Sequence, residues 1–181
     1  MTGTKSAPRV TVEELDAKSA RAAIPELAAV LADCVAGGAS VSFMDGFGLA
    51  ESALFFKTVF ESVVKGDTIL LGARDGRRIV GTVQLGLDTP PNQPHRADVK
   101  KLLVHRSARG SGVGEALMRE VETIARREGR TLLTLDTVTG EAGWRLYKRL
   151  GWEEVGVIPD YALYPGGHYC DTTVFYKKVR P

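Results

Sequence analysis

Apolar side chains return every three or four positions in several long stretches of the chain, which is the spacing of one helix face. These stretches cover roughly residues 17–36, 49–64 and 113–129, and each ends at or close to a glycine. A shorter stretch covers 141–150. Pro25 interrupts the first stretch, so either that helix kinks or a second helix starts with Pro25 in its first turn.

Between and after these helices the pattern changes to short apolar runs, which are typical of strands. Residues 68–73 and 78–87 flank an Asp75-Gly76 turn and predict a hairpin. Further strands are expected at residues 95–104, 131–136, 152–157 and 172–178. This order predicts an α/β fold, a mixed sheet flanked by helices, in a single domain over residues 1–181 with a core of about 8–180.

Composition excludes several classes of protein. The chain has 181 residues, 44% hydrophobic and 25% charged, and its net charge of +2 indicates neither nucleic-acid nor membrane binding. Cys34 and Cys170 are too few for a disulfide scaffold, and His95, His105 and His168 lack zinc-ligand spacing, so no metal is expected. Residues 1–10 contain no apolar leader, which favours a cytoplasmic location.

A glycine-rich turn connects the strand at 95–104 to the helix that follows it. Successive backbone N–H groups in such a turn converge at the positive end of the helix dipole, and glycine lets an anion approach closely. The turn therefore predicts a phosphate site made of Arg109, Gly110, Ser111, Gly112, Val113 and Gly114. The alternative is a strand-to-helix connection that binds nothing.

The type of phosphate ligand is a separate question. A nucleotide triphosphatase loop would end in Gly-Lys-Ser/Thr, which is absent. A dinucleotide motif would follow the first strand of the fold, whereas this one comes late in the chain, although Asp136 lies 22 residues past Gly114. Nicotinamide binding is thus the weaker alternative.

The stretch from Val104 to Gly114 resembles the Arg/Gln-x-x-Gly-x-Gly/Ala signature of the GCN5-related N-acetyltransferase (GNAT) family. Tyr147, followed by Gly151-Trp152, is similar to a second element of that family. The resemblance implies that backbone amides of the turn hold the pyrophosphate of acetyl-CoA, the co-substrate. The chain has Gly140 and Gly143 where the family often has Asn and Ala, which removes a side-chain contact to the pantetheine arm.

Within the family, the chain is most similar to the tabtoxin-resistance acetyltransferases, in residues 37–44, 95–102, 107–110 and 135–137. This resemblance implies that Asp98 is a general base, Asp136 a second acid, and Tyr147 the proton donor to the leaving thiolate. Asp98 lies six residues before Val104, about 20 Å along a strand, a distance comparable to the pantetheine arm. Alternatively, Asp98 pairs with Lys100 at the surface, Asp136 is a turn or cap residue, and Tyr147 packs under the sheet.

The expected reaction is direct transfer of an acetyl group to a primary amine of a small molecule that is amino-acid-like or resembles an antibiotic or toxin. A backbone amide of Leu103 or Val104 would polarise the thioester carbonyl. Protein amino termini or lysines are alternative acceptors, and an idle acyl-CoA-binding module or another phosphate-ligand enzyme are alternative functions. A monomer or homodimer is expected.

Overall fold

The computed structural model describes residues 10–180. Residues 1–9 and Pro181 lie outside it, and with them part of the basis for the expected absence of a leader and for the expected ends of the domain. Seven strands form one sheet in the order β1-β2-β3-β4-β5-β7-β6. The strands are β1 (Thr11–Glu14), β2 (Thr68–Asp75), β3 (Arg78–Gly86), β4 (Arg96–Val104), β5 (Leu132–Val138), β6 (Glu153–Leu163) and β7 (Tyr169–Lys178). All neighbours run antiparallel except β4 and β5, which are parallel.

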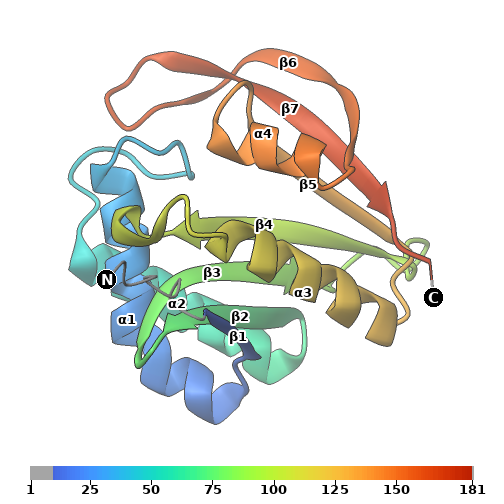
Figure 1. The fold of residues 1–181 in the computed structure, drawn as a ribbon, viewed down its shortest axis with the longest axis horizontal. Helices are drawn as coiled ribbons and strands as arrows, with labels where there is room; N and C mark the ends of the chain where they lie inside the picture. Colours follow the sequence, from blue (N-terminus) through green and yellow to red (C-terminus); the bar gives the residue numbers. More distant parts are fainter. Residues whose placement is uncertain (1–9, 181) are drawn as a thin grey trace, which may run out of the picture.

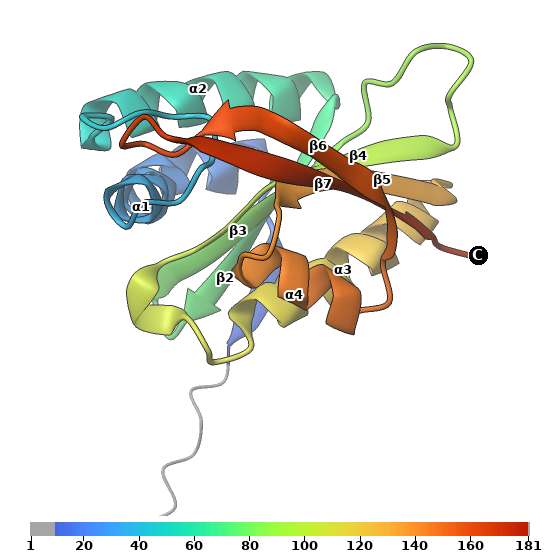
Figure 2. The same ribbon diagram turned by 90° about the horizontal axis from the view of Figure 1, so that it is seen from above.

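Helices cover both faces of the sheet (Figures 1 and 2). One face carries α1 (Ala17–Ala36) and α2 (Leu49–Lys65), and the other carries α3 (Val113–Arg127) and α4 (Ala142–Arg149). A 3₁₀ turn, Arg106–Ala108, joins β4 to the segment before α3. The predicted mixed sheet flanked by helices is thus confirmed.

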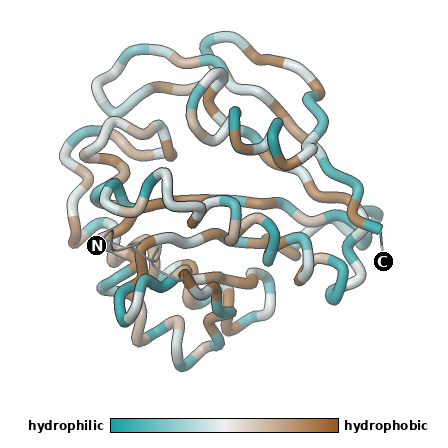
Figure 3. The backbone as a smooth tube through the Cα atoms, in the orientation of Figure 1, coloured by the Kyte–Doolittle hydropathy of each residue, from teal (hydrophilic) through white to brown (hydrophobic). Residues whose placement is uncertain are grey.

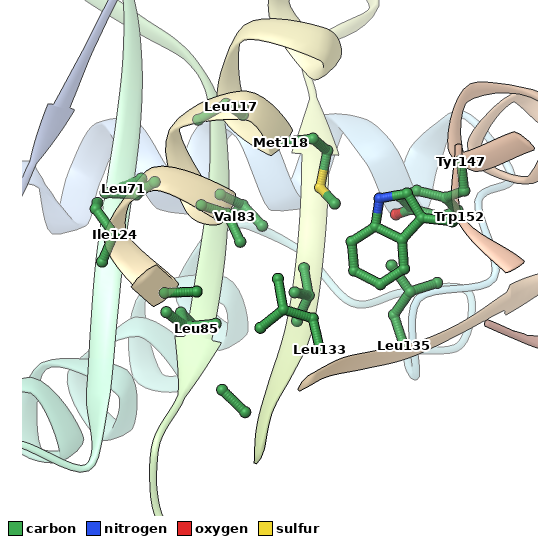
Figure 4. Packing of buried hydrophobic residues seen from close by; sticks show 14 of the residues in the cluster. Leu71, Val83, Leu85, Leu117, Met118, Ile124, Leu133, Leu135, Tyr147 and Trp152 are labelled. Atoms are coloured by element: carbon green, nitrogen blue, oxygen red, sulfur yellow. The ribbon is translucent and has the colours of Figure 1, made fainter. Parts of the chain in front are cut away.

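Two hydrophobic clusters lie on opposite faces of the sheet. Because side chains alternate along a strand, neighbouring residues of β2 belong to different clusters. Leu70 packs under α1 and α2, while Leu71 packs under α3. Figure 4 shows the second cluster, in which Leu117 and Ile124 of α3 lie over the central strands. Hydrophobic positions accordingly concentrate along the inner strands in Figure 3.

The sheet divides between β4 and β5. Their pairing covers only Arg96 with Leu132, Ala97 with Leu133 and Asp98 with Thr134, and the strands then diverge (Figure 1). On its other edge β4 has one extra residue against β3, which is a β-bulge. Lys101 lies in this bulge with a φ of 52°, in the left-handed region. The bulge bends β4 away from the line of β5 and leaves an open wedge in the sheet.

Three details differ from the expectations drawn from the sequence. Strand β1 was not predicted, because it is four residues long, mostly exposed, and pairs only with β2. Helix α1 continues through Pro25, so no second helix starts there. The last two strands extend beyond the expected residues 152–157 and 172–178: β6 continues to Leu163 and β7 begins at Tyr169.

Candidate active site

Two cavities border the wedge between β4 and β5. We call the first the aspartate cavity, since Asp98 and Asp136 line it, and it encloses about 850 Å³. We call the second the glycine cavity, since Gly110, Gly112 and Gly114 line it, and it encloses about 700 Å³. Tyr147 lines both, as do Leu102 of β4 and Thr137 and Val138 of β5, so they are the two ends of one cleft.

The glycine cavity brings together nearly all of the predicted phosphate site. Arg109, Gly110, Gly112, Val113 and Gly114 line it, together with Leu103 and Val104, the residues expected to polarise the thioester carbonyl. Gly110 and Gly112 have φ values of 77° and 87°, and the position of a Cβ on either would meet only open space. Gly112 caps α3, so the free N–H groups of the first helical turn lie beside the cavity. Anion binding is what this geometry favours.

Two residues of the turn have other contacts. Ser111 does not line the cavity, and its hydroxyl donates a hydrogen bond to the carbonyl oxygen of Ala108 at 2.7 Å. A Cβ on Gly114 would lie 3.1 Å from Leu146 Cδ2, so this glycine allows α3 to approach α4. Only part of the glycine pattern therefore concerns the cavity itself.

The glycine cavity also includes residues that the sequence did not single out. Arg109 donates from Nε to the carbonyl of Val104 at 3.2 Å, and its Nη2 lies 3.9 Å from Sγ of Cys34. Burial raises the pKa of the Cys34 thiol, an effect that Arg109 partly offsets. Arg149, after Tyr147 on α4, supplies a second cation to the lining. No sequence motif connects Cys34 to a turn 75 positions away.

Tyr147 lies where the two cavities meet. Its side chain is 6% exposed, and its ring centroid lies 5.9 Å from that of Trp152 (Figure 4). The ring centroid of Phe175 lies 6.0 Å away. Burial, and to a lesser extent the charge of Asp136, raises the pKa of the phenol well above its usual value. The ring is thus part of the core, as the structural alternative expected, while the residue still lines the cleft.

Asp98 is already engaged within the protein. Its Oδ1 accepts hydrogen bonds from Nη1 of Arg96 and from the hydroxyl of Thr134. Arg96 is itself held by Gln93, whose Oε1 accepts from Nε at 2.7 Å. The ion-pair partner of Asp98 is therefore Arg96 rather than Lys100, the partner in the surface alternative.

Asp136 is exposed on β5 and takes part in none of the side-chain hydrogen bonds or ion pairs found among residues 10–180. Across the same cavity, Lys101 donates to the hydroxyl of Ser42 at 2.8 Å and lies 5.6 Å from the centre of the Phe43 ring. Burial lowers the pKa of Lys101, and the charge of Asp136 partly opposes this shift. Sequence reasoning singled out Asp136 but missed Lys101, whose position depends on the bulge.

The segment between α1 and α2 closes one side of the aspartate cavity. Ser40 donates from Oγ to the carbonyl of Leu163 at 2.7 Å, and the N–H of Asp45 donates to the carbonyl of Pro165 at 3.2 Å. These bonds connect the segment to the turn between β6 and β7, which lies beside it in Figures 1 and 2. The cavity is consequently bounded by two segments far apart in sequence.

Within residues 10–180 no three His, Cys, Asp or Glu side chains come together as metal ligands. In the same residues no helix is both long enough and apolar enough to cross a membrane.

Solved structures share this fold. The yncA protein of Salmonella typhimurium, solved with its cofactor acetyl-CoA, superposes with a TM-score of 0.76 at 16% identity and covers 94% of each chain. The ribosomal-protein-alanine N-acetyltransferase of Brucella melitensis superposes with a TM-score of 0.76 at 21% identity, over 93% of this chain and 99% of that one.

Curated relatives match shorter stretches. N-acetyltransferase 8B of Rattus norvegicus is 35% identical over 86 residues, which are 46% of this chain and 39% of that protein. The IAA acetyltransferase of Azospirillum brasilense is 29% identical over 106 residues, or 58% of this chain and 67% of its own. This chain thus matches about two fifths of the rat protein. The model of the acetyltransferase (GNAT) family matches residues 41–152, more than half of the chain and most of the cleft, and the chain belongs to that family.

Proposed function

We propose that the protein is an acetyl-CoA-dependent N-acetyltransferase that acetylates a primary amine of a small molecule by direct transfer. One observation carries this proposal: a cleft between diverging strands joins an anion-binding cavity to a cavity with two carboxylates, and Tyr147 lies where they meet. A thioester bound from one end would meet an amine bound from the other. A protein that only senses the cofactor would need the glycine cavity alone.

The cofactor would enter through the glycine cavity. Its pyrophosphate would accept hydrogen bonds from the N–H groups at Gly110 to Gly114, assisted by the guanidinium of Arg109 after it leaves the Val104 carbonyl. The pantetheine arm would then follow the edge of β4 that β5 leaves unpaired beyond Asp98. A backbone amide of Leu103 or Val104 on this strand would polarise the thioester carbonyl.

The acceptor amine must lose a proton before it attacks. Asp136 has no partner among the described residues, so it would take this proton directly. Asp98 is held by Arg96 and Thr134, so it would act through a bridging water. The amine nitrogen then bonds to the thioester carbon, the C–S bond breaks, and coenzyme A leaves as a thiolate.

Tyr147 would stabilise that thiolate. Because burial raises its pKa, the phenol stays protonated at any working pH and donates a hydrogen bond to sulfur. Full proton transfer becomes favourable only as negative charge develops on sulfur in the same buried cleft, where the pKa of the thiol rises as well. The role expected from the family resemblance is therefore compatible with the geometry.

A small acceptor fits the bounded shape of the aspartate cavity. The hydrogen bonds of Ser40 and Asp45 to the β6–β7 turn restrict the opening that a protein chain would need. Two carboxylates at the cavity also attract an ammonium group. We therefore place the acceptor among amino-acid-like or toxin-like amines, acetylated in a metabolic or detoxification step as in the tabtoxin-resistance type that the sequence resembles.

The test is release of coenzyme A thiol from acetyl-CoA with a panel of small amines and of peptides with free amino termini or lysines. We expect amine-dependent release with small amines that exceeds release with peptides. Release only with peptides would favour protein acetylation. Tight binding of acetyl-CoA without release by any amine would identify an idle binding module.

A further inference from the structure

The aspartate cavity contains a cation as well as carboxylates. Residues 98–102 all line it, because the bulge at Lys101 breaks the alternation that would turn every second side chain away. Lys101 adopts a left-handed backbone that residues with a Cβ rarely take, and such conformations gather at functional sites. The backbone of β4 is therefore bent in a way that directs this ammonium into the cleft.

The ammonium of Lys101 makes no ion pair within the described residues, and the carboxylate whose charge acts on it is Asp136, across the cavity. The neighbours of the ammonium are the hydroxyl of Ser42 and the face of Phe43, and none of the ion pairs found in residues 10–180 includes it. Half-buried charges are normally paired, because the protein interior solvates a charge less well than water does. An anion bound in the cavity would supply the missing partner.

A second donor in the same cavity also lacks a partner. Gln84 on β3 is 6% exposed and lines the cavity, yet its Nε2 has no hydrogen-bond acceptor. Buried amide groups nearly always find a partner, so this nitrogen is a candidate donor to a bound acceptor group. Opposite these donors stands Asp136, whose carboxylate is equally unpaired.

We propose that the acceptor is an amino acid with a free carboxylate, and that Lys101 determines this specificity by binding the carboxylate while Asp136 receives the amine. This inference rests on the proposed acetyltransferase function. Phe43, Met44 and Phe55 form an apolar wall of the cavity that would contact the amino acid's side chain. Polyamines and other polycationic acceptors are disfavoured, because the Lys101 ammonium repels them.

Matched acceptors test the role of the carboxylate. The first series is L-phenylalanine, L-phenylalaninamide and phenethylamine, which share a ring and a primary amine, whereas only L-phenylalanine has a carboxylate. The second series is L-methionine, its amide and its decarboxylated amine. Steady-state thiol release is measured for each with wild type, Lys101→Met, Lys101→Arg and Lys57→Met. Lys57 is exposed on α2 and outside the cavity, so its variant controls for loss of charge.

We expect wild type to prefer the amino acid of at least one series over its amide and amine. Lys101→Met should lower kcat/KM for that amino acid by about 10- to 100-fold, mainly through KM, which is the usual effect of losing a charge-assisted hydrogen bond. The amide and amine should change by less than about 2-fold, Lys101→Arg should restore part of the loss, and Lys57→Met should behave as wild type.

Several results would overturn the inference. A loss of similar size on all three acceptors would mean that Lys101 only supports the structure of the cavity. Release with phenethylamine but with no carboxylate-bearing acceptor would leave the acetyltransferase function intact and remove the amino acid from it. Failure of every amine to release thiol would remove both.

Discussion

The two ends of the cleft are built in different ways. The glycine cavity takes its binding groups mainly from the backbone at one turn, where positive φ values at Gly110 and Gly112 and the start of α3 leave N–H groups free. The aspartate cavity takes its binding groups from side chains on separate elements, among them Ser42, Gln84, Lys101 and Asp136. A backbone site suits a ligand that never changes, whereas a side-chain site can be altered residue by residue for each acceptor.

Tyr147 belongs to both ends, so changing it should have the largest effect. Tyr147→Phe keeps the ring contacts with Trp152 and Phe175 but removes the hydroxyl. We expect kcat to fall by about 100-fold or more, the range for loss of a general acid, with acetyl-CoA affinity within about 2-fold of wild type. Thiol-release kinetics and calorimetry measure the two quantities. An unchanged kcat with a chemistry-limited acceptor would leave Tyr147 only a packing role.

The two carboxylates should not be equivalent. Asp136→Asn removes an unpaired carboxylate and should lower kcat/KM by about 100-fold, whereas Asp98→Asn changes a group already bound to Arg96 and Thr134 and should cost less. Rate profiles between about pH 6 and pH 9 measure both variants. Wild-type rates for both across that range would refute the account of two acids.

A matched pair of glycines separates cofactor binding from backbone strain. Gly112 and Gly129 lie before and after α3 with φ values of 87° and 69°, and neither has an atom near the position of a Cβ. Replacing either by Val should destabilise the fold by about 1–2 kcal/mol, the strain of a left-handed residue. Only Gly112→Val should also weaken acetyl-CoA binding, by about 10- to 100-fold. Equal affinities in the two variants would move the pyrophosphate elsewhere.

Burial of Tyr147 should also have a small effect on stability at alkaline pH. Its pKa is raised in the folded protein, so above about pH 10 the unfolded chain loses this proton while the folded protein keeps it. Stability therefore falls as pH rises through that range, and Tyr147→Phe should remove part of the fall. Denaturant midpoints for both proteins near pH 8 and pH 11 measure the difference; parallel losses would mean that the phenol ionises normally.

The same contrast explains what the sequence could predict. The helices, most strands and the glycine turn depend on periodicity and on adjacent residues, and they were predicted close to their observed bounds. The hydrogen bond of Thr134 to Asp98, the bulge that turns Lys101 into the cavity, and the contact of Ser40 with Leu163 depend on how strands shift and where distant segments meet. No local sequence pattern predicts those contacts, so the aspartate cavity could be recognised only in the structure.

A crystal structure of the protein with coenzyme A would test the central claim most directly, namely that the cofactor and the acceptor enter one cleft from opposite ends and meet at Tyr147. We predict pyrophosphate oxygens within hydrogen-bond distance of the N–H groups at Gly110 to Gly114, and the thiol sulfur beside the Tyr147 hydroxyl, with the aspartate cavity left open. A pyrophosphate bound away from the start of α3, or a thiol remote from Tyr147, would contradict it.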